Sequence, residues 1–230
     1  MKDIPVFTTE YGVASLLLKE IPYRETAYVV VRDVQPGAMT ELLRECRSFC
    51  RMAGAGRVYV CAGEPLEELP LFTAVLEMRG SAWRDPELLA NLFPVTEQTV
   101  SQWRRIYNER MRSVDNASTL ESKDEEKILS SGGAYFVHDR GQLLGIGWLE
   151  DTKLLAMAAA VPGGGERVMH TLMSLVEGST VTLEVASTNL RARKLYEKLG
   201  FLAVSEVSRW YDTAALDLSL NMNKDTERNL

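Results

Sequence analysis

The sequence contains few cysteines: three in 230 residues, Cys46, Cys50 and Cys61, all in the first third. Because an odd number of cysteines without a secretory leader does not suit a disulfide framework, we expect reduced thiols in a cytoplasmic protein. Cys46 and Cys50 lie four residues apart on an expected helix, a spacing that metal-ligand pairs also use. No histidine or second cysteine pair accompanies them, so we interpret both as buried packing residues and expect no metal.

Long apolar runs and clusters of basic residues are lacking as well. No apolar stretch approaches the roughly 20 residues of a membrane span, and the first five residues do not resemble a signal peptide. The formal net charge is -6, with 26 basic against 32 acidic residues, which argues against a nucleic-acid-binding surface. We therefore expect neither a membrane nor a nucleic-acid partner, and the acidic balance suits an amine substrate slightly better.

The apolar pattern in the first part of the chain indicates alternating strands and helices. The length allows one large domain or two small ones, with a substantial buried core. Runs of β-branched and aromatic residues predict strands, and apolar residues three and four apart predict helices. The expected strands cover 14–18, 27–32 and 57–62, and the expected helices cover 38–52 and 67–78.

In the second part of the chain, helical spacing gives way to a series of short strands. Thr96 suits a helix cap, and paired glycines at 132 and 133 end a later helix. The tail from Asp217 is polar, and we expect it to be mobile. The expected helices cover 96–112, 121–131 and 168–176, and the expected strands cover 134–138, 142–149, 153–161, 181–185 and 208–212.

One stretch near the carboxyl end, residues 183–201, joins a short strand, a helix and the next strand. Gly200 ends the helix, since glycine adopts positive φ at little cost. The pattern resembles the carboxyl-terminal motif of the GNAT superfamily of acyl-CoA-dependent N-acyltransferases. Its residues are Asn189-x-x-Ala192-x-x-x-Tyr196-x-x-x-Gly200-Phe201.

The resemblance implies an α+β fold with a central mixed, mostly antiparallel sheet flanked by helices. Residues 91–216 would form the GNAT acyltransferase domain. The order strand, Pro-Gly turn, helix, glycines, strand, helix and glycine occurs over residues 27–80 and again over 154–200, although a common α/β unit also recurs by chance. We therefore expect residues 1–90 to form a smaller, degenerate GNAT-like half domain, and residues 217–230 to form a flexible tail.

The resemblance also implies a site for acetyl-CoA, the acyl donor. In this family the pantetheine arm pairs with a splayed strand, and the pyrophosphate lies at the start of the following helix. The family's loop has Gln or Arg, two residues, Gly, one residue, then Gly or Ala; here Gly164, Arg167 and Met169 occupy these positions. Asn189 would bond the cofactor arm, and it also suits a helix N-cap. The expected cofactor-binding residues are Ala159, Ala160, Val161, Gly164, Gly165, Arg167, Val168, Met169 and Asn189.

Acyl transfer to an amine needs a base for the ammonium proton and an acid for the leaving thiolate. The resemblance implies that Tyr196 is the acid. Glu184 is the expected base, because a Leu-Glu-Val strand twelve residues before the tyrosine is similar to the ribosomal-protein N-terminal acetyltransferase branch. Pairing with an arginine is its alternative role. Trp103 and Tyr107 would either wall the acceptor pocket or pack in the core.

The combined prediction is an N-acetyltransferase that transfers an acetyl group from acetyl-CoA directly to a primary amine of a small molecule or protein. The departures in the phosphate loop leave a catalytically silent GNAT-fold module, binding a ligand or protein partner, as the alternative. Acceptor loops vary freely on a shared fold, so the acceptor stays open. The oligomeric state, including a homodimer, stays open too.

Overall fold

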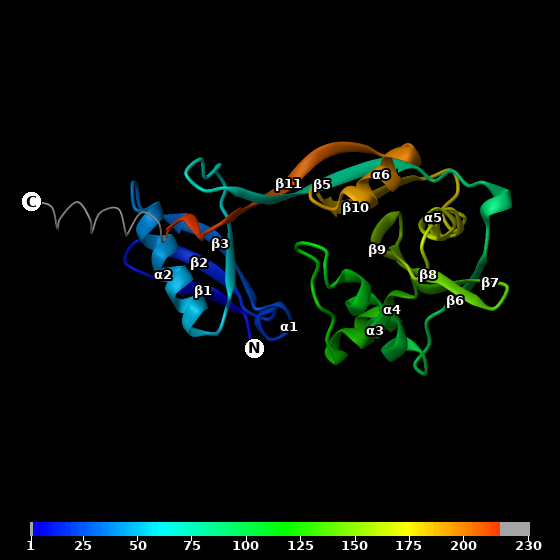
Figure 1. Ribbon diagram of the computed structural model, residues 1–230, viewed down its shortest axis with the longest axis horizontal. Helices are drawn as coiled ribbons and strands as arrows, with labels where there is room; N and C mark the ends of the chain where they lie inside the picture. The colour runs from blue at the N-terminus through cyan, green and yellow to red at the C-terminus, as the bar shows by residue number, and fades with distance from the viewer. Residues whose placement is uncertain (1, 217–230) are drawn as a thin grey trace, which may run out of the picture. The chain divides into compact units, whose positions relative to one another are not determined.

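A computed structural model describes residues 2–216, which fall into two compact units (Figure 1). Unit 1 extends to Ala74 and resumes at Ser208, and unit 2 lies between them. The strands β5 (Leu71–Ser81) and β11 (Leu202–Asp212) each begin in one unit and end in the other. The predicted boundary between residues 90 and 91 differs from this division, because β5 already belongs mostly to unit 2 and β11 returns to unit 1. The predicted tail, 217–230, lies outside the described residues.

Unit 1 is a small sheet with a helix packed on it. Its strands lie in the order β1-β2-β3-β4, followed by the end of β11, and β3 and β4 form a parallel pair. The long helix α2 buries Leu42, Leu43, Cys46 and Cys50 in the core that it forms with the sheet. The elements are β1 (Ile4–Thr8), β2 (Gly12–Leu17), α1 (Ile21–Arg24), β3 (Thr26–Val34), α2 (Met39–Met52) and β4 (Arg57–Cys61).

The two cysteines of α2 have the packing role that their spacing and neighbours predicted. Cys46 and Cys50 are 0% exposed. Burial raises the pKa of each thiol to about 12, so both stay protonated at neutral pH.

The helix predicted over residues 67–78 is wrong, because this segment leads into the strand β5. β5 lies between β10 and β11, and four of its residues are buried. The short apolar run Ala74-Val75-Leu76 lies inside this strand, and periodicity alone does not distinguish such a run from a buried helix.

Unit 2 is a mixed, mostly antiparallel sheet covered by helices on both faces, as the predicted fold class requires. From β5 its strands follow in the order β10-β9-β8-β7-β6, and only β9 and β10 run parallel. One apolar cluster joins α5 and α6 to the sheet, and a second joins α3 and α4. The elements are η1 (Pro86–Leu88), β6 (Asn91–Pro94), α3 (Val100–Met111), η2 (Ser122–Asp124), α4 (Glu125–Ser131), β7 (Ala134–Asp139), β8 (Gln142–Glu150), β9 (Lys153–Ala159), α5 (Gly165–Met173), β10 (Thr180–Ala186) and α6 (Leu190–Lys198).

Two glycines of β8 determine where α5 lies. A Cβ atom on Gly147 would come within 2.3 Å of Leu172 Cδ1, and one on Gly145 within 2.8 Å of Val168 Cγ2. The helix can therefore approach the β8 backbone only because both positions lack a side chain. None of the helices within residues 2–216 is long and apolar enough to cross a bilayer.

Candidate active site

The strands β9 and β10 begin as a parallel pair and then separate. Their residues pair at Lys153 with Thr182 and at Leu154 with Leu183. Beyond these positions β9 continues beside β8 and β10 beside β5. The facing edges of the two strands are therefore left open, and an open strand edge can pair with an extended ligand through backbone hydrogen bonds.

Two cavities open along the gap between β9 and β10. The inner cavity, about 350 Å³, lies between residues 154–157 of β9 and 183–186 of β10. The loop cavity, about 490 Å³, extends toward the start of α5. The two share the side chains or backbone of four residues, so they form one continuous depression: Arg110, Met157, Asn189 and Ala192.

Tyr196, near the end of α6, lines the inner cavity. Its ring packs in the core of unit 2, with a centroid 6.1 Å from that of Phe201. The hydroxyl forms no hydrogen bond with the described residues, yet its oxygen is not sealed from solvent, so it opens onto the cavity. Burial raises the pKa of Tyr196 to about 12, so the phenol keeps its proton throughout the neutral range.

Two carboxylates line the same cavity, Glu184 and Asp115. Glu184 accepts a hydrogen bond from Lys153 Nζ at 2.7 Å, so its partner is a lysine rather than the arginine considered from the sequence. Asp115, in the loop after α3, accepts a hydrogen bond from the Thr188 hydroxyl at 2.7 Å. Nothing in the sequence pointed to Asp115, because an aspartate in a polar loop has no distinctive pattern.

The loop cavity reaches the amino end of α5 at Gly165. A Cβ atom there would lie 3.1 Å from Leu195 Cδ2 and 4.0 Å from Ala159 Cβ, so the glycine keeps this end of the cavity open. The backbone N–H groups of a helix's first turn have no acceptor within the helix, and the helix dipole adds positive potential. This end of the cavity therefore suits an anion.

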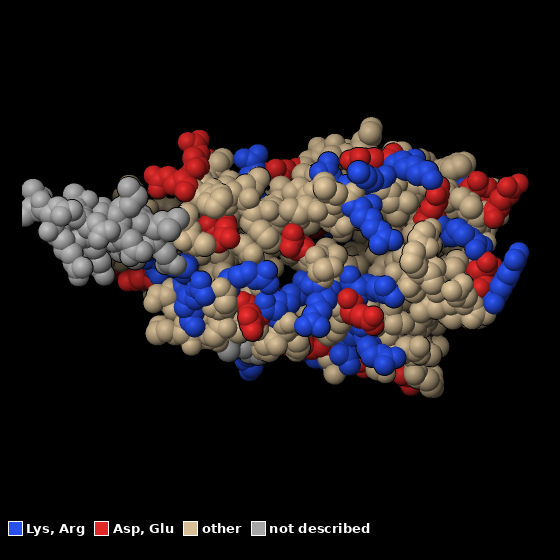
Figure 2. All heavy atoms as spheres, viewed as in Figure 1, with Lys and Arg blue, Asp and Glu red and all other residues tan. Residues whose placement is uncertain are grey.

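Side-chain charges modify the potential at this helix end. Glu166, in the first turn of α5, is neutralised by Lys198 of α6, whose Nζ lies 2.6 Å from its carboxylate. Arg191 also lines the loop cavity and has no ion-pair partner among residues 2–216. Lysine and arginine side chains gather over α6 and over α3, on either side of a hollow (Figure 2). The cations near the amino end of α5 therefore belong to α6, whereas the basic residue among the expected cofactor-binding residues, Arg167, lies on α5.

Three of the predicted cofactor-binding residues line the loop cavity: Ala159, Gly165 and Asn189. Asn189 Oδ1 accepts a hydrogen bond from Ala192 N at 3.2 Å, which confirms its N-cap role. Asn189 also lines both cavities.

The other predicted residues of the loop do not line either cavity and pack beneath it. Val168 and Met169 are buried in the core, and Gly164 lies against Val161. The carbonyl of Ala160 accepts a hydrogen bond from Arg110 Nη2 at 2.9 Å, which ties β9 to α3.

Arg167, one of the expected cofactor-binding residues, does not line either cavity. Its Nη1 atom donates to Asp139 Oδ2 at 2.7 Å, and its other nitrogens lie 3.4 Å from the carbonyl oxygens of Leu88 and Leu89. The hydrogen bond from Arg167 lowers the pKa of Asp139. Position 167 faces η1 and β7 because α5 turns this side away from the gap.

The aromatic residues of α3 have different roles. Trp103 is fully buried, and its Nε1 donates to the carbonyl of Tyr135 at 3.0 Å, so it packs in the core. Tyr107 stacks on Trp103 with ring centroids 5.7 Å apart and lines the inner cavity. Within residues 2–216, no cluster of three or more His, Cys, Asp or Glu side chains could hold a metal ion.

Solved structures with this arrangement include proteins described as GCN5-related N-acetyltransferases. One from Kribbella flavida has a TM-score of 0.57 and 12% identity, covering 91% of this chain and 90% of its own. One from Anabaena variabilis has a TM-score of 0.58 and 10% identity, covering 89% of this chain and 60% of its own. A functionally unknown conserved protein from Staphylococcus epidermidis has a TM-score of 0.55 and 11% identity, covering 90% of this chain and 91% of its own.

The identities to these structures are low, so the similarity shows a shared fold. The sequence matches no protein-family model and no curated protein. At the level of the fold, the resemblance that the motif of residues 189–201 predicted is confirmed.

Proposed function

We propose that this chain, which has the fold of the GNAT superfamily, is an N-acetyltransferase that transfers an acetyl group from acetyl-CoA directly to a primary amine. The observation that carries the proposal is the separation of β9 and β10 beside Tyr196 and Asn189. A strand gap with open edges, a helix amino end at one side and a protonated phenol at the other provides the three parts that a thioester donor needs. Fold similarity alone does not decide activity, so the residues of the gap must support it themselves.

The donor would lie along the gap, with its pantetheine amides paired to the open edge of β9 beyond Leu154. Its phosphates would lie at the amino end of α5, where Gly165 leaves room for close approach. Arg191 supplies a positive charge at this end, and Lys198 offsets the negative charge of Glu166. The residues present therefore fit a phosphorylated, extended donor, even though the glycine spacing of the family loop has changed.

Tyr196 would protonate or hydrogen-bond the sulfur as it leaves. The amine nitrogen attacks the thioester carbonyl carbon, a C–N bond forms, and the C–S bond breaks with its electron pair on sulfur. A phenol whose pKa burial has raised to about 12 is fully protonated at neutral pH, so it can donate a hydrogen bond to the developing thiolate.

Glu184 would take the proton that the attacking amine loses. It lies on β10, twelve residues before Tyr196, and it lines the same cavity. Its hydrogen bond to Lys153 stabilises the carboxylate and orients it. Asp115 is the other carboxylate of the cavity, and its bond to Thr188 holds the loop after α3 near the turn between β10 and α6.

The experiment is a thermal-shift titration of the full-length protein with acetyl-CoA, followed by thiol release in the presence of a panel of primary amines. A ligand that binds only the native state at about a hundred times its Kd stabilises that state by about 2.7 kcal/mol. We expect stabilisation by acetyl-CoA and amine-dependent release of CoA thiol, with turnover much lower in E184Q than in D115N. A larger loss in D115N would transfer the base role to Asp115.

The rival function, a catalytically silent module, makes a different prediction for the same titration. The loop departs from the family pattern at Gly164, Arg167 and Met169, and this departure is its support. No stabilisation at millimolar acetyl-CoA would favour the silent module. Stabilisation without thiol release for any amine would retain the donor site and refute transfer to the amines tried.

A further inference from the structure

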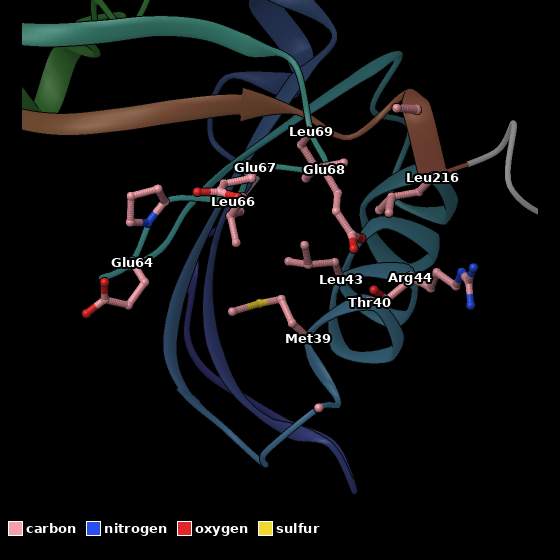
Figure 3. A pocket seen from close by; sticks show the side chains of 13 residues that line it. Met39, Thr40, Leu43, Arg44, Glu64, Leu66, Glu67, Glu68, Leu69 and Leu216 are labelled. Atoms are coloured by element: carbon pink, nitrogen blue, oxygen red, sulfur yellow. The ribbon is translucent and has the colours of Figure 1, made fainter.

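Unit 1 contains a cavity of its own, about 720 Å³, between α2 and the segment that joins β4 to β5 (Figure 3). Every described residue that lines it belongs to unit 1. Ligand pockets for small molecules have volumes of roughly 300–1,000 Å³, so this cavity is of ligand size. It is separate from the gap between β9 and β10, and an inference about it does not depend on the transferase proposal.

The interior of this unit 1 cavity is apolar. Met39 and Leu43 of α2 project into it from one side and Leu66 of the β4–β5 segment from the other (Figure 3). Leu69 and Leu216 also line it, and Leu43, Leu69 and Leu216 are all buried. Such walls bind an apolar body through the hydrophobic effect but do not select its charge.

Charge selection comes from the β4–β5 segment, which carries Glu64, Glu67 and Glu68. Within residues 2–216 none of the three has a hydrogen bond or an ion pair. Glu68 extends from its segment toward α2, so its carboxylate lies over the cavity, whereas Glu64 points away (Figure 3). Three unneutralised carboxylates at one opening give a negative potential there.

The one basic residue among the described lining residues, Arg44, does not balance these carboxylates. Its guanidinium points away from the cavity (Figure 3) and lies 3.8 Å from the carboxylate of Glu41 on the same helix. A ligand with a carboxylate or phosphate would meet the glutamates, and no cation among residues 2–216 that line the cavity faces it there. Acetyl-CoA, which carries several phosphate charges, is therefore unsuited to this cavity.

We propose that the unit 1 cavity is a binding site for an organic ammonium ion with an apolar body, such as an alkylamine. The apolar part fills the space between Met39, Leu43 and Leu66, and the ammonium group lies against the Glu68 carboxylate. This assigns to unit 1 a ligand of opposite charge to the phosphorylated donor proposed for unit 2. The two sites therefore select different molecules through different charges.

The test compares three six-carbon probes, hexylamine, 1-hexanol and hexanoate, on the full-length protein carrying ¹³C-methyl methionine. The signal of the Met39 methyl group is identified by its loss in M39L, a substitution that conserves volume. We expect hexylamine to shift this signal with the highest affinity of the three. E68Q, which keeps the shape and removes the charge, should weaken hexylamine about three- to fivefold, as for a partly exposed ion pair.

E64Q is the matched control, because it removes the same charge from a side chain that points away from the cavity. It should weaken hexylamine less than E68Q does. Equal affinity for hexylamine and 1-hexanol, or tighter binding of hexanoate, would overturn the ammonium assignment. No Met39 shift with any probe would overturn the site itself. A Met39 shift that depends on protein concentration without any probe would assign the cavity to a second copy of the chain and also overturn it.

Discussion

The segments β3-α2-β4 of unit 1 and β9-α5-β10 of unit 2 are the same supersecondary unit, two parallel strands joined by a helix. In unit 1 the strands stay paired at five consecutive positions, from Thr26 with Arg57 to Val30 with Cys61. In unit 2 they pair at two positions and then separate. One parallel pair thus forms part of a closed core, and the other opens into a cavity.

The two connecting helices, α2 and α5, also differ in which strands they cover. α2 packs against β2, β3 and β4, so it covers both strands of its parallel pair. α5 packs chiefly against β8 and β9, because Gly145 and Gly147 let it approach the β8 backbone directly. The gap between β9 and β10 is instead lined by α6 and its N-cap, through Tyr196 and Asn189. The same local unit therefore gives a core or a binding gap according to which strands its helix covers.

Removing the Tyr196 hydroxyl should have the largest effect on the function that distinguishes unit 2. Y196F keeps the ring packed near Phe201 but removes the proton donor. General acid–base catalysis contributes about 10²- to 10⁴-fold, so kcat should fall within that range while the Kd for acetyl-CoA stays unchanged. Steady-state kinetics and a binding titration measure the two quantities, with Y211F, a buried tyrosine of unit 1, as the control. Equal losses of turnover and of binding would show that Tyr196 is structural.

Alkaline pH should destabilise unit 1 more than unit 2. The thiols of Cys46 and Cys50 have a pKa of about 12 in the folded protein against an ordinary value of 9.0, and Tyr196 about 12 against 10.0. A raised folded pKa contributes stability that is complete below the ordinary value and is lost as pH rises toward the folded value. At pH 10.5 unit 1 should therefore have lost up to about 2 kcal/mol per thiol, and unit 2 less than about 1 kcal/mol from its phenol.

Urea unfolding at pH 8 and pH 10.5, followed by circular dichroism, measures this loss. The double variant C46A/C50A should lose less stability between the two pH values than the unsubstituted chain. C61A is the control, because Cys61 is only partly buried. An unchanged loss in C46A/C50A would refute the role of the two thiols.

The sequence was most informative where structure is decided locally. Glycine at position 200, with positive φ of 83°, ends α6 as predicted, and the alternating strands of unit 2 follow their expected order. The motif of residues 189–201 identified the fold because cap, helix stop and strand all lie within a few residues of each other. Local sequence signals also explain why α2 was predicted correctly.

The remaining features depend on contacts between distant segments. β5 could not be told from a helix, because its neighbours in the sheet, β10 and β11, lie far away in the sequence. Arg167 lies in the segment expected to bind the cofactor, but its partner Asp139 lies on β7, a distant strand. Arg191 and Asp115 reach the cavities only through the folding of α6 and of the loop after α3. None of these contacts between distant segments can be read from the spacing of residues in the sequence.

The smallest substitution tests whether the first residue of the helix keeps the gap open. α2 begins with Met39, whose side chain projects into the unit 1 cavity, whereas α5 begins with Gly165. G165A would place a methyl group 3.1 Å from Leu195 Cδ2, the flexible end of a side chain that can move by a few tenths of an ångström. We therefore expect the free energy of unfolding to change by less than about 1 kcal/mol, since alanine also favours the helix. The affinity for acetyl-CoA should be about tenfold weaker, because the methyl group keeps a phosphate from the backbone N–H groups. G63A adds the same methyl group at a turn of unit 1 with nothing within 4 Å, and it should leave binding unchanged. Equal affinity in G165A and G63A, measured by calorimetry, would show that the donor's phosphates do not lie at this helix end and would remove the contrast between the two helix starts.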